Sequence, residues 1–421
     1  MNDSENNKWN ILISSKSLQR MMLILLLILI TISSCKKESG SSYSHYVSKE
    51  LVLTYSNTYI NNLIANASAI YPDFNNIKSQ FTNAVKVNKL VYKTKVGGKE
   101  IEASGLICTP DSPGNYPVIC FQNGTNTLNA YAPSMLATMT SYQMIEVVAS
   151  IGYIVVVPDY PGFGASSQIP HPYLVSEPTV TSIVDMLTSV KEVMSTGFPG
   201  LTLKNEYYLI GYSQGGWATM AVHKALETTY SGDFNLIGSV CGAGPYDIKY
   251  LVQSMIGSQT YSMPVYLGYI VNAYKAYGQF DNPVSDILNE PYASRLSTLY
   301  TGLLTSDQIN AQLTTSVSGL LTADFINGLA SSSKYSTVRS ALTSNSIAPW
   351  HTYKPLYMLH GGSDTQVNPA VTNFFYDSLI ASGTSPSVLT KEILPGLDHG
   401  DGIVPCLLKG LQFIINLSVL R

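Results

Sequence analysis

The segment Gly211-Tyr212-Ser213-Gln214-Gly215 holds the residue of this chain best suited to nucleophilic chemistry. It follows a short apolar run at 207–210 and precedes a helical pattern at 217–226. A serine in a tight strand-to-helix turn needs small neighbours two residues before and after it, and the two glycines meet that need. Such a turn points the Ser213 hydroxyl out of the sheet. It also places the Gln214 N–H at a helix start, ready to stabilise an oxyanion.

A serine hydroxyl alone is a weak nucleophile, so we expect a histidine base and an orienting acid, in the chain order Ser, Asp or Glu, His. Of the six histidines, His399 fits best. It lies in a glycine-rich loop, 396–402, between a strand pattern and a helical pattern, from which it can reach across the strand ends to the serine. The others precede the core, lie on neighbouring elements or precede the candidate acid: His45, His171, His223, His351 and His360.

The acid follows from the same reasoning about strand ends. Residues 356–360 form an apolar strand pattern, and 361–369 turn off its end toward a helix. Asp364 in that turn is the expected carboxylate, which would hold the imidazole tautomer and stabilise the imidazolium. Asp398 and Asp401 compete for this role because they flank His399, although adjacent residues seldom face one another and short acidic residues often stabilise loops.

A second oxyanion donor is expected from the loop after an earlier strand. The apolar run 117–121 is followed by Gln122-Asn123-Gly124-Thr125-Asn126. Gly124 permits a sharp turn, so the N–H of Thr125 can face a reacting carbonyl. The alternative is a simple hairpin turn, which Asn-Gly also indicates.

The rest of the chain predicts the sheet that would carry these loops. Two alternating strand patterns, 87–95 and 101–108, flank a turn at Gly97-Gly98. Further on, apolar strand patterns alternate with helical ones at 142–150 and 180–194; the strand patterns lie at 153–157, 207–210, 236–241, 356–360 and 389–394. This alternation predicts an α/β fold with a mostly parallel sheet and helices on both faces.

Residues 248–354 separate two consecutive strand patterns, which is too long for a plain loop. Apolar residues spaced among many small polar ones indicate several short helices there. We expect an inserted, mainly helical cap over Ser213. The alternative is a structural insertion away from the site.

Several separated motifs together resemble the secretory lipase family of α/β-hydrolases and its bacterial relatives, from about residue 86 to the C-terminus. They are the segments at 121–125, 157–164, 171–174, 211–216 and 242–247, with the loops of Asp364 and His399. The resemblance implies an eight-stranded α/β-hydrolase sheet and carboxylic ester hydrolysis, with no metal or organic cofactor. It also suggests a substrate pocket near Tyr160, Tyr173 and Tyr212. Asn123 departs from the pattern, since histidine usually precedes this glycine.

The N-terminus predicts export. Lys16 and Arg20 precede an apolar run at 21–30 that is too short for an ordinary membrane span, so residues 1–34 read as a signal peptide. Small residues directly before Cys35 resemble a bacterial lipobox, with Cys35 then lipidated and the protein anchored to a membrane of the cell envelope, the outer membrane being our expectation. Residues 35–50 read as a polar tether and 51–421 as the hydrolase domain. An incidental cysteine after an ordinary signal peptide is the alternative.

Composition narrows the partners. The net charge is −3 and no basic patch interleaved with aromatic residues is present, so nucleic acid is not expected as a partner. Only 12% of residues are charged and 29 are tyrosines, which suits lipid esters, and equally acetyl or aromatic esters on carbohydrate. The thiols of Cys108, Cys120, Cys241 and Cys406 show no metal-ligand spacing, and three lie in apolar strand patterns that favour buried free cysteines.

Two other classes of function remain open on the sequence. A prolyl-peptidase-like hydrolase would share the triad but needs a large domain ahead of the catalytic one, for which there is little room before residue 87. A non-catalytic binding protein on the same fold is the other, because fold does not fix function. The presence of all three candidate residues argues against it.

Overall fold

The computed structural model describes residues 44–135 and 140–419 of this chain. Residues Ser44–Arg421 form one compact unit. The expected signal peptide, the expected lipidation site Cys35 and the first part of the expected tether lie outside the described residues. Within the described ranges, no helix is both long enough and apolar enough to cross a bilayer.

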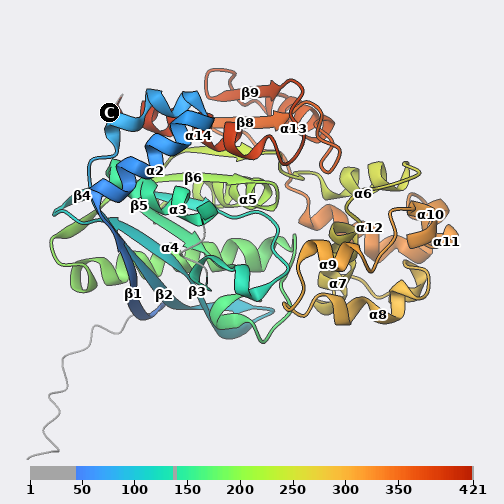
Figure 1. Cartoon of the computed structure of the whole chain (residues 1–421). Helices are drawn as coiled ribbons and strands as arrows, with labels where there is room; N and C mark the ends of the chain where they lie inside the picture. The colour runs from blue at the N-terminus through green and yellow to red at the C-terminus, as the bar shows by residue number, and fades with distance from the viewer. Residues whose placement is uncertain (1–43, 136–139, 420–421) are drawn as a thin grey trace, which may run out of the picture. The chain divides into compact units, whose positions relative to one another are not determined.

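A nine-stranded sheet forms the centre of the molecule, in the order β1-β2-β3-β5-β4-β6-β7-β8-β9 (Figure 1). The pairs from β1 to β5 in this order are antiparallel, and all later pairs are parallel. The expected mostly parallel sheet is therefore confirmed. The strands are β1 (Tyr46–Tyr55), β2 (Val85–Val96), β3 (Lys99–Pro110), β4 (Gly114–Gln122), β5 (Ile154–Pro158), β6 (Leu201–Tyr212), β7 (Leu236–Gly242), β8 (Leu356–Gly361) and β9 (Leu389–Leu394).

Strand β1 corrects two expectations, the polar tether over 35–50 and the count of eight strands. The chain is already in the sheet at Tyr46, and β1 pairs antiparallel with β2, with Glu50 opposite Lys89. Most of its side chains are exposed because it is an edge strand. Charged residues on such an edge discourage pairing with another chain, and here they make a strand look like a polar linker.

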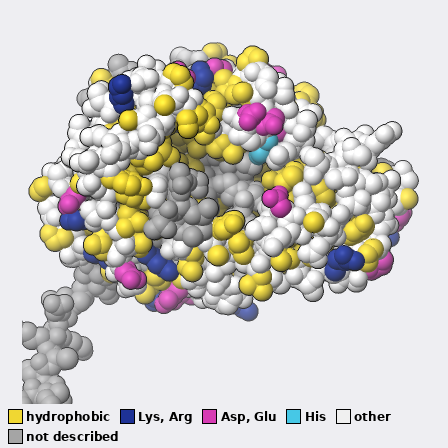
Figure 2. Space-filling model, viewed as in Figure 1, with side chains coloured by type: hydrophobic (Ala, Val, Ile, Leu, Met, Phe, Trp, Pro, Cys, Tyr) yellow, Lys and Arg dark blue, Asp and Glu magenta, His cyan; other side chains and the backbone are white. Residues whose placement is uncertain are grey.

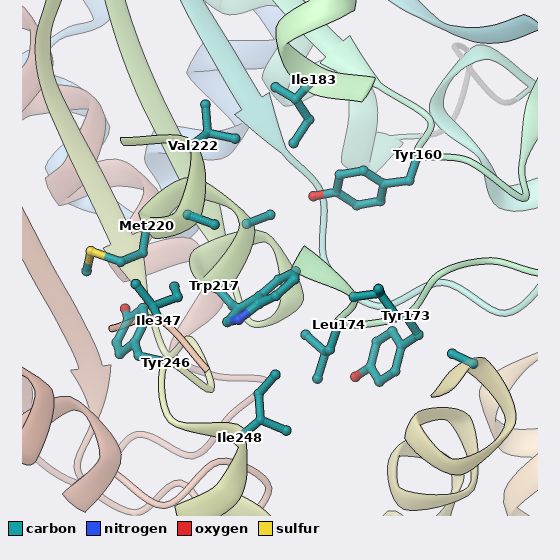
Figure 3. Packing of buried hydrophobic residues seen from close by; sticks show 14 of the residues in the cluster. Tyr160, Tyr173, Leu174, Ile183, Trp217, Met220, Val222, Tyr246, Ile248 and Ile347 are labelled. Carbon is teal, nitrogen blue, oxygen red and sulfur yellow. The ribbon is translucent and has the colours of Figure 1, made fainter. Parts of the chain in front are cut away.

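Helices cover both faces of the sheet, as expected. Helices α2 (Asn57–Ile70), α3 (Thr140–Glu146) and α14 (Ile403–Val419) pack on one face, and α4 (Ser176–Gly197), α5 (Gln214–Glu227) and α13 (Ala370–Ala381) on the other. Figure 3 shows part of the core on the α5 face, where Trp217 is fully buried. Its indole N–H donates to the backbone oxygen of Asn345 at 3.2 Å, which ties α5 to the end of the long segment between β7 and β8.

That long segment folds as helices beyond one end of the sheet (Figure 1). Its α-helices are α6 (Ile248–Ile256), α7 (Pro264–Ala276), α8 (Tyr292–Leu299), α9 (Ser306–Asn310), α10 (Val317–Leu320), α11 (Ala323–Gly328) and α12 (Ser336–Asn345). Short 3₁₀ helices complete the chain: η1 (Pro72–Asn76), η2 (Lys78–Gln80), η3 (Asn129–Tyr131), η4 (Pro133–Met135), η5 (Val147–Ile151), η6 (Gly164–Ser166), η7 (Val284–Asp286) and η8 (Ser333–Tyr335).

Glu192 of α4 fastens the start of β1 to the body of the fold. Its carboxylate accepts hydrogen bonds from the backbone N–H groups of Ser44 (3.0 Å), His45 (3.0 Å) and Tyr46 (2.8 Å). Burial raises the pKa of Glu192, but the Ser44 hydroxyl and these N–H donors outweigh it and lower the pKa to about 2. These bonds therefore stabilise the fold above the ordinary glutamate pKa, and their contribution is lost as the pH falls toward about 2.

We predict that Glu192→Gln lowers the free energy of unfolding at pH 7 by about 1–2 kcal/mol, because an amide oxygen is a weaker acceptor than a carboxylate. The difference from the wild type should shrink as the pH falls from 4.5, the ordinary pKa of glutamate, toward about 2, the pKa of Glu192. Urea unfolding over a pH series measures both. Glu102→Gln, exposed on β3, is the matched control. If Glu192→Gln lowers the free energy of unfolding by the same amount at every pH, the ionised carboxylate of Glu192 is not the source of this stability.

Candidate active site

The turn between β6 and α5 holds Ser213 in an unusual conformation. Its φ of 59° and ψ of −123° lie outside the regions that residues with a side chain favour, at a cost of about 1–3 kcal/mol. A Cβ on Gly215 would lie 1.9 Å from the backbone oxygen of Gln122, and one on Gly211 would lie 2.4 Å from that of Gly215. Both positions therefore require glycine. The Ser213 N–H donates to the oxygen of Gly242 at 2.8 Å and fixes the turn on β7.

The structure brings Ser213, His399 and Asp364 together from loops that are far apart in the chain. His399 Nε2 lies 2.9 Å from Ser213 Oγ, and His399 Nδ1 lies 2.6 Å from Asp364 Oδ2. A carboxylate only accepts, so Nδ1 carries the proton and Nε2 is free to accept the serine proton. The three side chains form one continuous hydrogen-bonded chain.

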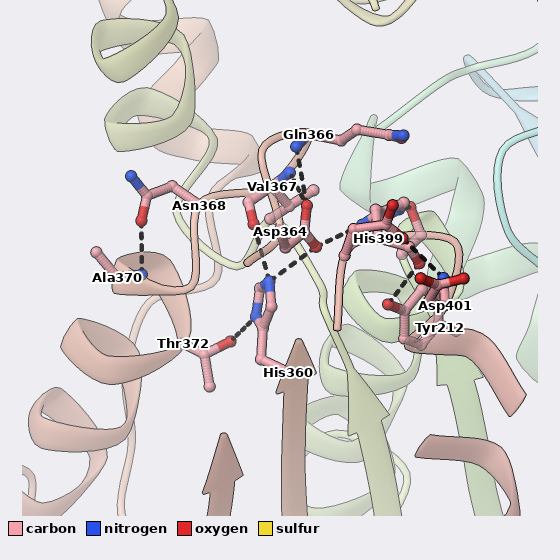
Figure 4. A network of polar contacts seen from close by, with 12 residues as sticks. Tyr212, His360, Asp364, Gln366, Val367, Asn368, Ala370, Thr372, His399 and Asp401 are labelled. Atoms are coloured by element: carbon pink, nitrogen blue, oxygen red, sulfur yellow. Dashed lines mark hydrogen bonds and ion pairs between the residues drawn. The ribbon is translucent and has the colours of Figure 1, made fainter. Parts of the chain in front are cut away.

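The Asp364 carboxylate is held from both sides (Figure 4). Its Oδ1 accepts from the N–H groups of Gln366 (2.8 Å) and Val367 (2.9 Å). Burial alone would raise the pKa of Asp364, but donation from His360 and His399, the charge of His399 and the N–H of Val367 hold it well below its ordinary value. The group is ionised at neutral pH and can stabilise a positive imidazole.

His360 is a neighbour of this site that the sequence analysis set aside. It is the penultimate residue of β8, is fully buried, and its Nε2 lies 3.1 Å from Asp364 Oδ2, the same oxygen that faces His399. The chain order Ser, Asp, His excludes His360 as the base, but it does not exclude a contact between His360 and the acid. The position of His360, four residues before Asp364 at the end of a strand, could have predicted that contact.

The two predicted oxyanion donors lie on adjoining segments. Gln214 opens α5, and the first N–H groups of a helix have no intrahelical acceptor. A Cβ built on Gly124 would lie 3.6 Å from the backbone oxygen of Tyr212, so the loop carrying Thr125 runs alongside the serine turn. Asn123, the departure from the expected histidine, is buried, and its amide makes no hydrogen bond within the described residues.

The three tyrosines expected near the pocket are all buried and brace the loops around the site. Tyr160 donates to the backbone oxygen of Asn123 at 3.1 Å, and Tyr212 donates to that of His399 at 2.8 Å. The Tyr173 hydroxyl lies 3.0 Å from Thr125 Oγ1. Tyr212 and Tyr160 thus position the base loop and the oxyanion loop, and Tyr173 faces the side chain of the candidate donor.

His171 and Asp398, two polar residues near the candidate triad, form hydrogen bonds that support the structure around it. His171 is fully buried, its Nδ1 lies 2.7 Å from the oxygen of Pro161 and its Nε2 lies 2.8 Å from the Gln214 amide. Burial lowers the pKa of His171 to about 4, so it is neutral and braces Gln214. The exposed Asp398, a rival for the acid, accepts from the N–H of Asp401 at 2.8 Å within its own loop.

The inserted helices contact the loops of the site directly. Tyr269 of α7 donates to the oxygen of Asn126 at 3.2 Å, and Tyr261 donates to the oxygen of Gln366 at 3.1 Å. The Tyr269 ring also stacks on Tyr173, with ring centroids 4.4 Å apart. The insertion therefore packs on both the oxyanion loop and the acid loop.

An apolar cavity of about 400 Å³ lies on the other face of the sheet, between α2, α3 and α14. Among the described residues that line it are Phe121 of β4 and Ile210 of β6, and the lining includes neither Ser213 nor Thr125. Figure 2 shows this face with few charged side chains and with hydrophobic ones around a hollow.

Comparison with solved structures finds proteins that share this fold. A putative hydrolase from Legionella pneumophila aligns over 89% of this chain and 98% of its own, with 23% identity and a TM-score of 0.77. The rice cell wall degrading esterase LipA from Xanthomonas oryzae aligns over 89% and 97%, with 21% identity and a TM-score of 0.76. Candida antarctica lipase A, in its closed state, aligns over 89% and 82%, with 16% identity and a TM-score of 0.64.

These likenesses establish the α/β-hydrolase-like fold that the sequence predicts. A search of curated proteins found no match. The family model described as secretory lipase matches residues 130–386, which span the serine turn, the insertion and the acid loop. The chain therefore belongs to the secretory lipase family, whose members are carboxylic ester hydrolases.

Proposed function

We propose that this protein hydrolyses lipophilic carboxylic esters through Ser213, His399 and Asp364, by way of an acyl-enzyme. The observation that carries the proposal is the unbroken chain of hydrogen bonds from Ser213 Oγ through His399 to Asp364, at 2.9 and 2.6 Å. It supports general-base activation of the serine in a turn that holds the hydroxyl outward.

In the first half of the reaction, His399 Nε2 takes the Ser213 proton while Oγ attacks the carbonyl carbon. The N–H groups of Gln214 and Thr125 would bind the oxyanion, and Asp364 stabilises the imidazolium. Collapse of the tetrahedral intermediate breaks the ester C–O bond, and His399 protonates the leaving alcohol. Water, activated by His399, then attacks the acyl-serine, releases the acid and restores the Ser213 hydroxyl.

The first test removes the members of the triad one at a time. We expect Ser213→Ala and His399→Ala each to lower kcat for p-nitrophenyl butyrate by at least about 10⁴-fold, because the residues act as a unit. Asp364→Asn should lower kcat strongly as well, since it disturbs the tautomer. Asp398→Asn is the matched control and should keep most of the activity. Retained activity in Ser213→Ala would refute the proposed nucleophile.

The insertion is proposed to act as a cap that selects the acyl group. Its tyrosines pack on the oxyanion loop and the acid loop, so a change there alters the walls around the bound ester. The triad itself is indifferent to chain length, whereas a pocket discriminates by about 1–3 kcal/mol per methylene.

Tyr269→Ala tests the cap. We expect the ratio of kcat/KM for octanoate over acetate esters to change by about 10-fold or more, because the variant opens the stack on Tyr173. Tyr353→Ala, at a tyrosine that is 70% exposed, is the control and should leave the ratio unchanged. An unaltered ratio in folded Tyr269→Ala would mean that this part of the insertion does not shape the acyl site.

We also propose that the mature chain begins at Cys35 and is held to a membrane of the bacterial envelope by acyl chains on that cysteine. The support is the cationic start, the apolar run at 21–30 and Ser33-Ser34-Cys35. The family, described as secretory, agrees with export. One acyl chain alone binds membranes weakly, so a stable anchor requires more than one.

Mass spectrometry of the N-terminal peptide, with fractionation of cells that express the full chain, tests the anchor. We expect an acylated peptide that starts at Cys35 and a protein in the membrane fraction. Cys35→Ser should remove the acyl groups and block cleavage at that position. A soluble wild-type protein cut elsewhere and free of lipid would show that Cys35 is incidental.

A further inference from the structure

A second histidine contacts the carboxylate of the candidate triad. His360 Nε2 lies 3.1 Å from Asp364 Oδ2 and 2.8 Å from the backbone oxygen of Val367. Both partners are acceptors, so Nε2 carries a proton and shares it between them. The other nitrogen, Nδ1, lies 2.7 Å from the hydroxyl of Thr372 on α13. One neutral tautomer, with the threonine hydroxyl donating to Nδ1, satisfies all of these contacts.

We propose that His360 is a positioning residue for ester hydrolysis, which acts through Asp364 by holding Oδ2 in line with His399 Nδ1. This inference rests on the proposed function of the triad. Asp364 Oδ1 is fixed by two backbone N–H groups, and Oδ2 receives one imidazole from each side, so the carboxylate has no freedom to rotate.

His360 itself is rigidly mounted. It is the penultimate residue of β8, a strand flanked by β7 and β9, and its side chain is 0% exposed. Figure 4 shows its ring between Thr372 and the turn of Asp364 and Val367. The strand and helix α13 thus transmit their rigidity to a carboxylate that lies in a loop. A site held by such elements keeps its geometry better than one held by loops alone.

His360 also affects how strongly the Asp364 carboxylate attracts the proton on His399. A hydrogen bond from Nε2 stabilises the carboxylate and reduces its pull on the His399 proton. Without this donor, the carboxylate holds the proton on His399 more strongly. Removing His360 should therefore have two effects. The value of kcat should fall because the Asp364 carboxylate is misplaced, and the acid limb of the kcat/KM profile should move to higher pH.

Other titratable groups near the pair do not obscure this readout. Four such groups interact electrostatically with Asp364: Tyr212 of β6, Cys406 of α14, and Tyr261 and Tyr266 of the insertion. Burial raises the pKa of each of these four groups, so all remain neutral through the acid range. Asp398 is exposed in the His399 loop and stays the same in every variant.

The test compares His360→Leu with His360→Gln, whose amide N–H takes the place of Nε2–H. We expect His360→Leu to lower kcat for p-nitrophenyl butyrate by about 10- to 100-fold with KM within about twofold of the wild type. The acid limb of kcat/KM should move up by about one pH unit. His360→Gln should recover most of the loss and return the acid limb toward the wild-type position.

His223→Leu is the matched structural control. His223 is also fully buried and also lies near a carboxylate, with its Nε2 3.5 Å from Glu227 Oε2. Its other contacts are the hydroxyls of Ser239 and Thr352, so none of them is a member of the candidate triad. The His223→Leu variant should have a lower melting temperature than the wild type and an unmoved acid limb. An unmoved acid limb in His360→Leu, with a loss of kcat no greater than that of His223→Leu, would overturn the inference.

Thr372→Val provides a second variant if His360→Leu does not fold. The substitution removes the hydroxyl that orients His360 and leaves the side-chain volume nearly unchanged. We expect a smaller loss of kcat and a smaller upward shift of the acid limb than in His360→Leu. Unchanged kcat and an unmoved acid limb in that variant would also overturn the inference. Ser213→Ala distinguishes failure of this inference from failure of the proposed triad. If Ser213→Ala is inactive and His360→Leu behaves like the wild type, only the positioning role of His360 is refuted. If Ser213→Ala is active, the triad is refuted.

Discussion

The conformation of Ser213 is the constraint on which the rest of the structure depends. A serine with positive φ costs free energy, and it persists only where the surroundings leave no alternative. Here the first turn of α5 lies so close to the end of β4 that no side chain fits at Gly215. The same close contact sets the oxyanion loop beside the serine. Packing of α5 through the buried Trp217 therefore supports both the strained turn and its chemical partners.

The other members of the site follow the logic of a parallel sheet. Strands β4, β6 and β8 end at one edge, so the loops of Thr125, Ser213 and Asp364 meet there, and the loop of His399 follows β9. A buried carboxylate is costly unless it is well bonded, and Asp364 accepts from two backbone N–H groups and two imidazoles. The insertion contacts the loops that carry Thr125 and Asp364, through hydrogen bonds from Tyr269 and Tyr261.

Much of this was predictable because its signals are local. Glycine spacing around Ser213, apolar strand patterns and loops at strand ends are properties of neighbouring residues, and they led to Ser213, Asp364 and His399. Strand β9 begins and ends where the pattern placed it, at 389–394. The length between two strand patterns indicated the insertion in the same way.

What could not be predicted depends on partners far away in the chain. The first half of β1 contains Ser48, Lys49 and Glu50 and reads as a continuation of the polar stretch before it. It is a strand because it pairs with the edge of β2 and because Glu192 accepts from the N–H of Tyr46. The contact of His360 with Asp364 depends on how the turn after β8 folds back on its own strand. The roles of Tyr160 and Tyr212 as braces likewise follow from backbone oxygens that no sequence pattern identifies.

Peptide mapping after reaction of the protein with a p-nitrophenyl alkylphosphonate tests the central claim most directly. The phosphonate resembles the tetrahedral intermediate, and attack by the activated serine forms a stable P–O bond with release of p-nitrophenol. The account predicts one phosphonyl group per chain, carried by Ser213, and loss of ester hydrolysis in proportion to labelling. Labelling of a different residue that accompanies the loss of activity, or no label on a protein that hydrolyses esters, would contradict it.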